Sequence, residues 1–226
     1  MSKENEDYPY NLEILRKKVK NITLSVRPGR KVRITAPQDY DVSPYLKSKE
    51  KWIFRQINKF EKLCPEMEDK EGLMLYNGIF YPIKEEKNRC GIFPDENTAY
   101  YNSVKNFKEW LKSDLRNDLT LRLKEHSIIM DASFKGFSIR TQKTRWGSCS
   151  TSGKLNFNIR MAAIPDNLKD YIVIHELAHI YQPNHSPDFW KIVTEYDSNF
   201  KSHREELKKY WIMTETSKVW NTITEK

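Results

Sequence analysis

The segment Ile174-His175-Glu176-Leu177-Ala178-His179 constrains this chain more than any other. Two histidines four residues apart on a helix lie on one face, one turn above each other. The helix around them is almost entirely apolar, with Leu168, Tyr171, Ile172, Val173, Ile174, Leu177, Ala178 and Ile180. Burying two imidazoles and a carboxylate in such a helix is costly without a strong partner. The segment therefore predicts a buried helix whose histidines hold a metal ion.

A third ligand is expected just after this helix. Pro183 disfavours helical geometry at Gln182, so the helix should end near Gln182. Ser186-Pro187-Asp188 is typical of the start of another helix, which leaves His185 on a short corner between the two. The pattern predicts the Zn²⁺ site of a hydrolase. The metal ligands would be His175, His179 and His185, and Glu176 would be the base that acts on water.

The alternative interpretation is a chance match, in which these histidines are ordinary polar groups of a core. Three of the five histidines of the chain fall between residues 175 and 185, and this clustering favours the metal site.

Composition places the chain among globular proteins, with 38% hydrophobic and 12% aromatic residues. No apolar run approaches the length that spans a membrane, and the first ten residues lack a signal-peptide core. The cysteines Cys64, Cys90 and Cys149 are odd in number and widely spaced, as expected of free thiols in a reducing compartment. A cytoplasmic protein with no membrane partner is expected.

The formal charge of +8 is concentrated near the N-terminus, where residues 1–64 hold 15 Lys and Arg against 8 Asp and Glu. Such a basic face could meet nucleic acid, nucleotides or acidic protein surfaces. No nucleic-acid-binding motif accompanies the charge, so a solvated face is the simpler interpretation.

Hydrophobic periodicity predicts an N-terminal β-rich subdomain with one helix over residues 1–104. Its expected elements are a hairpin at 21–35, a helix capped by Ser43, a hairpin turning at Asn77-Gly78, and weaker strands near Ile92 and Ala99-Tyr100-Tyr101.

Residues 105–211 are expected to form the catalytic core, followed by a loosely held tail at 212–226. This core should contain a helix from Val104 to His126, strands at 134–141 and 154–162, the metal helix, and two further helices. The loop 144–150 would place Arg145 against an anionic substrate oxygen, with Trp146 beside it, although Trp146 could instead cap the core. The strand 154–162 or its neighbour is the candidate edge for an extended peptide.

Several of these motifs resemble the YgjP-like metallopeptidase family. They are Arg145-Trp146-Gly147-Ser148-Cys149-Ser150, Leu155-Asn156, Pro165, His175-Glu176-Leu177-Ala178-His179, and Asn184-His185-Ser186 with Phe189-Trp190. The N-terminal hairpin and helix also look like the front part of that family. The family is similar to the SprT-like proteases and belongs among the zincins.

The resemblance implies an α+β fold with a zincin-like core, in which the active-site helix packs on a small antiparallel or mixed sheet beside an N-terminal hairpin and helix. It implies Zn²⁺ held by His175, His179 and His185, with Glu176 as base. The spacing to the third histidine also matches the metzincins, but Gln182 stands where those enzymes need glycine. That departure argues against a true metzincin.

The expected function is a zinc-dependent metallopeptidase that hydrolyses internal bonds of a peptide or protein. One alternative is a nucleoside triphosphate pyrophosphohydrolase using the same site, an activity also assigned within the family. The chain shows no P-loop signature and no carboxylate cluster suited to magnesium. Another alternative is a non-catalytic DNA- or protein-binding module with a structural metal, against which the presence of Glu176 argues.

Overall fold

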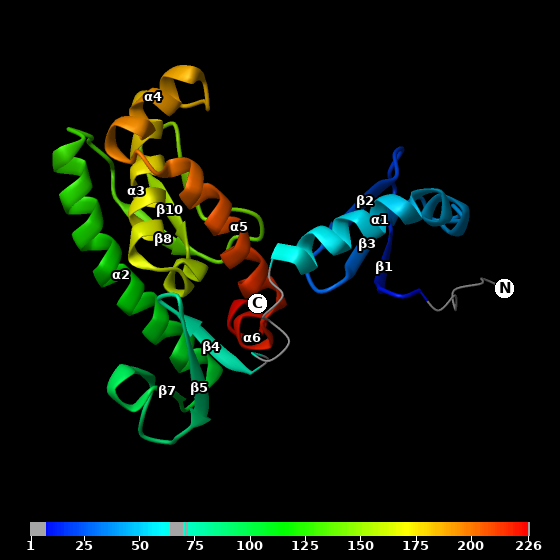
Figure 1. The fold of residues 1–226 in the computed structure, drawn as a ribbon, viewed down its shortest axis with the longest axis horizontal. Coiled ribbons are helices and arrows are strands. Elements are labelled where there is room, and N and C mark those ends of the chain that lie inside the picture. The colour runs from blue at the N-terminus through cyan, green and yellow to red at the C-terminus, as the bar shows by residue number, and fades with distance from the viewer. Residues whose placement is uncertain (1–7, 64–69, 71, 226) are drawn as a thin grey trace. The chain divides into compact units, whose positions relative to one another are not determined.

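The computed structural model describes residues 8–63, 70 and 72–225. The chain divides into two compact units, Met1–Glu68 and Asp69–Lys226, and each contains both helix and sheet (Figure 1). The predicted α+β class is confirmed. The sequence suggested a boundary at 104, whereas the strands between residues 73 and 101 lie in the second unit.

The first unit packs one helix on a three-stranded sheet. The elements are β1 (Asn11–Arg16), β2 (Thr23–Arg27), β3 (Lys31–Ala36) and α1 (Ser43–Leu63), with strand order β1-β3-β2. The hairpin of β2 and β3 is confirmed, and β1 adds to it in parallel. Side chains of β3 and α1 form the core of the unit, chiefly Val32, Ile34, Leu46, Ile53 and Ile57.

The second unit begins with a four-stranded sheet of order β4-β5-β7-β6. Its strands are β4 (Leu73–Tyr76), β5 (Ile79–Glu85), β6 (Gly91–Phe93) and β7 (Thr98–Tyr101), with the short 3-10 helix η2 (Pro94–Glu96) before β7. The expected hairpin turns at Asn77 and Gly78, whose φ angles of 49° and 79° suit the left-handed turn that joins two strands tightly.

A long helix, α2 (Val104–Ile129), leads to a three-stranded mixed sheet of order β8-β10-β9. Its strands are β8 (Phe137–Arg140), β9 (Gly147–Cys149) and β10 (Leu155–Asn158), and the 3-10 helix η3 (Ile159–Ala163) follows.

The strand expected at 154–162 is shorter than predicted and central in its sheet. Asn158 ends it, because its side chain accepts a hydrogen bond from the Arg160 amide and donates to the carbonyl groups of Gln142 and Arg145. Because β10 has a neighbouring strand on both sides, it cannot pair with a peptide, and the prediction of β10 as the peptide-binding edge is wrong. Its neighbour β9, within the segment expected to be a loop, pairs only with β10 among the described strands.

The remaining elements are helices, namely α3 (Asp166–Tyr181), α4 (Pro187–Tyr196), α5 (Phe200–Thr216) and α6 (Lys218–Thr224). Helix α3 runs through the core of the second unit. The expectation of a loosely held tail is wrong, because Trp220 in α6 is fully buried and its indole N–H donates to the Leu75 carbonyl at 3.0 Å.

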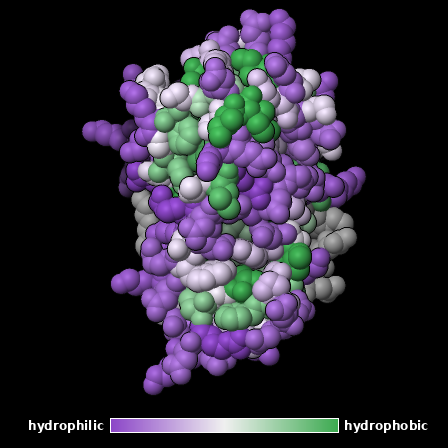
Figure 2. Space-filling model, turned by 90° about the vertical axis from the view of Figure 1, so that its left-hand side faces the viewer, coloured by the Kyte–Doolittle hydropathy of each residue, from purple (hydrophilic) through white to green (hydrophobic). Residues whose placement is uncertain are grey.

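Most of the solvent face shown in Figure 2 is hydrophilic, with a hydrophobic patch toward the upper end. The large hydrophobic side chains exposed on α2 are Val104, Leu121, Ile128 and Ile129, and Tyr181 of α3 is exposed as well. None of the described helices combines the length and the apolar character that crossing a membrane requires. Cys90 and Cys149 are free thiols, while Cys64 lies outside the described residues.

A network of charges joins α2 to α3 and so fixes the helix that carries the histidines. Arg122 bridges Asp118 at 2.7 Å, Asp166 at 2.5 Å and Asp170 at 2.6 Å. Lys169, only 3% exposed, pairs with Asp118 at 2.8 Å. The sides of α2 and α3 that face each other are thereby fixed in register.

We expect Asp170→Asn to lower the free energy of unfolding by about 1 kcal/mol at pH 7, because Arg122 loses one of its three partners. Burial raises the pKa of Asp170, but hydrogen bonds from His126 and Arg122 outweigh it and leave that pKa lowered. The stabilisation is therefore complete above about pH 4, the unfolded pKa, and disappears as the pH falls through the lower folded value.

Thermal unfolding of the two proteins between pH 3 and pH 7 measures this difference. Asp188→Asn is the matched control, since the pair of Asp188 and Lys191 is exposed and should contribute little. If the stability difference between wild type and Asp170→Asn grew toward low pH, the ionised Asp170 would not be stabilising the fold.

Candidate metal centre

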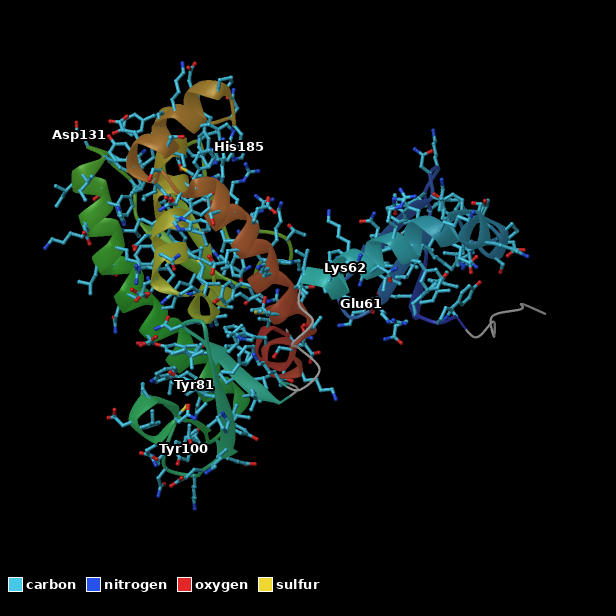
Figure 3. All side chains as sticks on the ribbon, viewed as in Figure 1. Glu61, Lys62, Tyr81, Tyr100, Asp131 and His185 are labelled. Atoms are coloured by element: carbon cyan, nitrogen blue, oxygen red, sulfur yellow. The ribbon has the colours of Figure 1, made fainter. Side chains whose placement is uncertain are left out.

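Three imidazoles meet at the C-terminal end of α3. His175 and His179 come from successive turns of the helix, and His185 comes from the corner between α3 and α4 (Figure 3). One ring nitrogen from each lies within 4.8 Å of the others, and the Nε2 atoms of His175 and His185 are 3.1 Å apart. Nitrogen ligands of a tetrahedral zinc ion lie roughly 3.4 Å apart. The cluster could hold such an ion.

The chain around the histidines folds locally as the sequence indicated. Helix α3 ends at Tyr181, and the Gln182 amide makes its last backbone hydrogen bond, to the Ala178 carbonyl. Ser186 caps α4 by accepting a hydrogen bond from the Phe189 amide. The corner between the two helices therefore has few residues, and it turns His185 back toward α3.

Two of the imidazoles are oriented through their second nitrogen. The Nδ1 of His179 lies 3.1 Å from the Gln182 carbonyl oxygen, and the Nδ1 of His175 lies 3.4 Å from the Tyr171 hydroxyl. A proton on each Nδ1 leaves the Nε2 lone pair free to bind a metal.

The three rings are neutral at pH 7, which is the form that binds metal. Burial lowers the pKa of His175 to about 3, and the other two histidines and Arg204 add to the effect. Burial also lowers the pKa of His179 and of His185.

Aromatic rings hold His185, the most exposed of the three. Its ring stacks on the Trp190 indole with centroids 5.7 Å apart and meets the edge of Phe189 at 4.8 Å. Phe189 also stacks on His179 at 4.5 Å. Neither aromatic residue was expected from the sequence to belong to the site. Their position just after His185, in the first turn of a capped helix, was the signal that could have placed them there.

Glu176, which lies between His175 and His179 on α3, is buried in the protein. Its side chain is 4% exposed, and its Oε2 atom has no hydrogen-bond partner among the described residues. Burial raises the pKa of Glu176 to about 8, against the opposing charge of Arg145. A buried carboxylate with a raised pKa binds a proton readily, and its unpaired oxygen can accept a hydrogen bond from a further polar group.

Gly147 in β9 leaves room for the Glu176 carboxylate. A Cβ atom at position 147 would lie 2.5 Å from Oε1 and 2.8 Å from Cδ of Glu176. The φ angle of Gly147 is not positive, so this position does not need a glycine for a left-handed turn. This glycine is needed for the close approach of a strand to a side chain.

Of the two residues predicted to bind substrate, Arg145 lies at the surface and Trp146 is packed against another side chain. Arg145 is exposed, and its charge reaches Glu176. The Trp146 ring packs edge-to-face on Trp211 at 5.1 Å, as expected of a side chain that caps the core. A second cation, Arg204 of α5, lies over the Trp190 ring at 4.6 Å and lowers the pKa of His175 and His185; the sequence analysis missed it.

Comparison with known proteins gave one match. The model of a family described as YgjP-like, metallopeptidase domain, matches residues 20–210. No curated protein and no solved structure matches the chain.

We expect Gly147→Ala to displace the Glu176 side chain and to destabilise the fold by about 1–3 kcal/mol, the usual cost of overpacking. Zinc uptake should persist, because the imidazoles do not touch position 147, while hydrolysis should fall at least tenfold. Zinc content, thermal unfolding and turnover of the purified variant measure the three effects. Thr151→Ala, an exposed residue just beyond β9, is the control and should change none of them.

We expect Trp190→Ala to weaken zinc binding about tenfold, because His185 loses the ring on which it stacks. Competition with a chromogenic chelator measures the affinity. Trp190→Phe should restore most of it, and Trp146→Phe, which changes a ring that packs on Trp211 instead, should leave it unchanged. Equal affinities for all four proteins would show that the indole does not position the ligand.

Proposed function

Because the chain belongs to the YgjP-like metallopeptidase family, we propose that it is a zinc-dependent peptidase that hydrolyses internal peptide bonds. The observation that carries this proposal is the meeting of three neutral imidazoles beside a buried glutamate. His175, His179 and His185 would hold the ion, and Glu176 would act as the base.

The residues present fit a zinc ion. Their donor set is three neutral ring nitrogens, the borderline ligands that zinc favours, and an open fourth position is typical of catalytic rather than structural sites. The unpaired Oε2 of Glu176 supports the same assignment, since a closed structural site leaves no acid without a partner. This point also weighs against a non-catalytic binding module. When bound, zinc supplies a Lewis acid that polarises a carbonyl group and lowers the pKa of water.

The proton transfers fall to Glu176. Its apolar surroundings raise its basicity, so in the ionised form it can take a proton from the attacking water and later deliver it to the leaving amine. Gly147 lets the carboxylate lie beside β9, where the scissile bond of a substrate on that strand would be within its reach.

We place the peptide along β9. This strand has an unpaired edge among the described strands, and Gly147 within it touches Glu176. An extended peptide that adds to such an edge gains main-chain hydrogen bonds without requiring a particular sequence. Internal bonds of unfolded protein are therefore the expected substrates.

We expect Glu176→Gln to reduce peptide hydrolysis by about 10²–10⁴-fold while zinc stays bound, because the amide cannot accept the proton. Turnover of a quenched fluorescent casein and zinc content of the same preparation measure this. Chelation should abolish the activity of the wild type, and added zinc should restore it. A Glu176→Gln variant with wild-type turnover would exclude the proposed base.

A second candidate function is hydrolysis of a nucleoside triphosphate at the same site. The observation that favours it is a pair of exposed arginines, Arg145 and Arg204, whose charges reach Glu176 and the histidines respectively. Neither guanidinium has an ion-pair partner among the described residues. Arginine is the side chain best suited to bind phosphate oxygens.

Arg204→Gln separates the two candidates. For a nucleotide substrate we expect KM to rise on the order of tenfold, because the loss of one charge-assisted contact weakens phosphate binding. For a neutral peptide, KM should change less than twofold. Pyrophosphate release and cleavage of an uncharged quenched fluorescent peptide are measured on one preparation, with Lys191→Gln as the control, since Lys191 is an exposed cation paired with Asp188.

A further inference from the structure

The solvent face of α1 carries a row of cations that runs nearly the whole length of the helix. The row consists of Lys47, Lys51, Arg55, Lys59 and Lys62, all of them exposed. Successive members are three or four residues apart, so they rise by about 5–6 Å each and span roughly 22 Å in all. The cations therefore form a linear array.

This row lies opposite the face of α1 that packs in the core. The buried residues of the helix are Leu46, Ile53 and Ile57, which pack with β3. At 100° per residue, the row occupies an arc of about 120° centred on the side away from them. The apolar face of the helix is thus buried in the core of the first unit, and the cationic face is exposed to solvent.

Both acidic residues of α1 are engaged outside this row. Glu61 bonds to Arg30 at 2.8 Å, and Figure 3 labels it beside Lys62 at the C-terminal end of the helix. Glu50 lies close enough to Tyr10, a core residue, to contribute to the raised pKa of that phenol after burial and Tyr8. None of the five cations has an ion-pair partner among the described residues. A solvated helix usually intersperses the two signs of charge, which this face does not.

A tryptophan adjoins the cationic row. Trp52 follows Lys51, and 39% of its surface is exposed, although tryptophan is rarely left so open without a partner. Its position on the helix is at the edge of the arc, toward the side of Lys59. Single-stranded nucleic acids are bound by this combination, in which cations follow the backbone and an aromatic ring stacks on an unpaired base.

We propose that the cationic face of α1 binds single-stranded nucleic acid, with the row contacting phosphates and Trp52 stacking on a base. The linear array suits a flexible strand that can lie along the helix, and Trp52 needs a base that is not paired. An anionic membrane fits less well, because insertion requires several apolar side chains and this face offers one. The surface lies in the first unit and is independent of the proposed peptidase chemistry.

The test uses the full chain and a fluorescein-labelled oligothymidine of 20 nucleotides, with fluorescence anisotropy as the readout. We expect binding whose affinity falls about 50-fold between 50 and 200 mM salt, for four or so phosphate contacts on a single strand. Changing Lys51, Arg55, Lys59 and Lys62 together to Gln should abolish most of this salt dependence. The matched control changes four exposed lysines of the second unit, Lys105, Lys124, Lys135 and Lys154, and should retain tight binding.

Trp52→Ala should weaken the complex about tenfold with the salt dependence unchanged, because stacking is lost and the charges remain. Circular dichroism and thermal unfolding confirm that each variant is folded. Equal loss in both fourfold variants would overturn the proposal in favour of net charge alone. A duplex of the same length bound as tightly, or phosphatidylserine vesicles bound in preference to the oligonucleotide, would overturn the assignment to single strands.

Discussion

The burial of Glu176 is the constraint on which the catalytic unit depends. A carboxylate that is 4% exposed is tolerated only where space, counter-charge and a polar partner are provided for it. Gly147 provides the space, and Arg145 provides part of the charge. A partner for the unpaired Oε2 atom would come from the water and substrate of the proposed reaction. The absence of a side chain at position 147 lets β9 lie against α3 at this carboxylate.

The scaffold contacts α3 from several sides and so orients the helix that carries two of the three histidines. The charge network of Arg122 and Lys169 fixes the helix against α2. At the other end, the rings of Phe189 and Trp190 enclose the imidazoles. A site whose ligands are pre-organised in this way loses little conformational entropy when an ion binds. Stability of the core and affinity of the proposed metal site are therefore coupled.

The two units differ in the chemistry they present. The second unit buries several ionisable groups in specific contacts, as in the pair of Arg160 and Glu215 at 3.0 Å. The first unit leaves its cations in solvent along one helix. This division is consistent with a catalytic unit joined to a unit that recruits a polyanion, each with its own core.

The sequence by itself determined the elements whose signals are local. The C-terminal end of α3, the start of α4, the turn at Asn77-Gly78 and the clustering of three histidines all follow from residue types within a few positions of one another. Only the tertiary structure decided what depends on distant segments, such as the pairing of β9 with β10, the burial of α6 and the approach of Gly147 to Glu176. A three-residue strand has almost no periodicity to detect, and a glycine does not reveal which side chain will need its space. Arg204 was missed for the same reason, since its nearness to the histidines comes from the packing of α5 and from nothing in its own sequence.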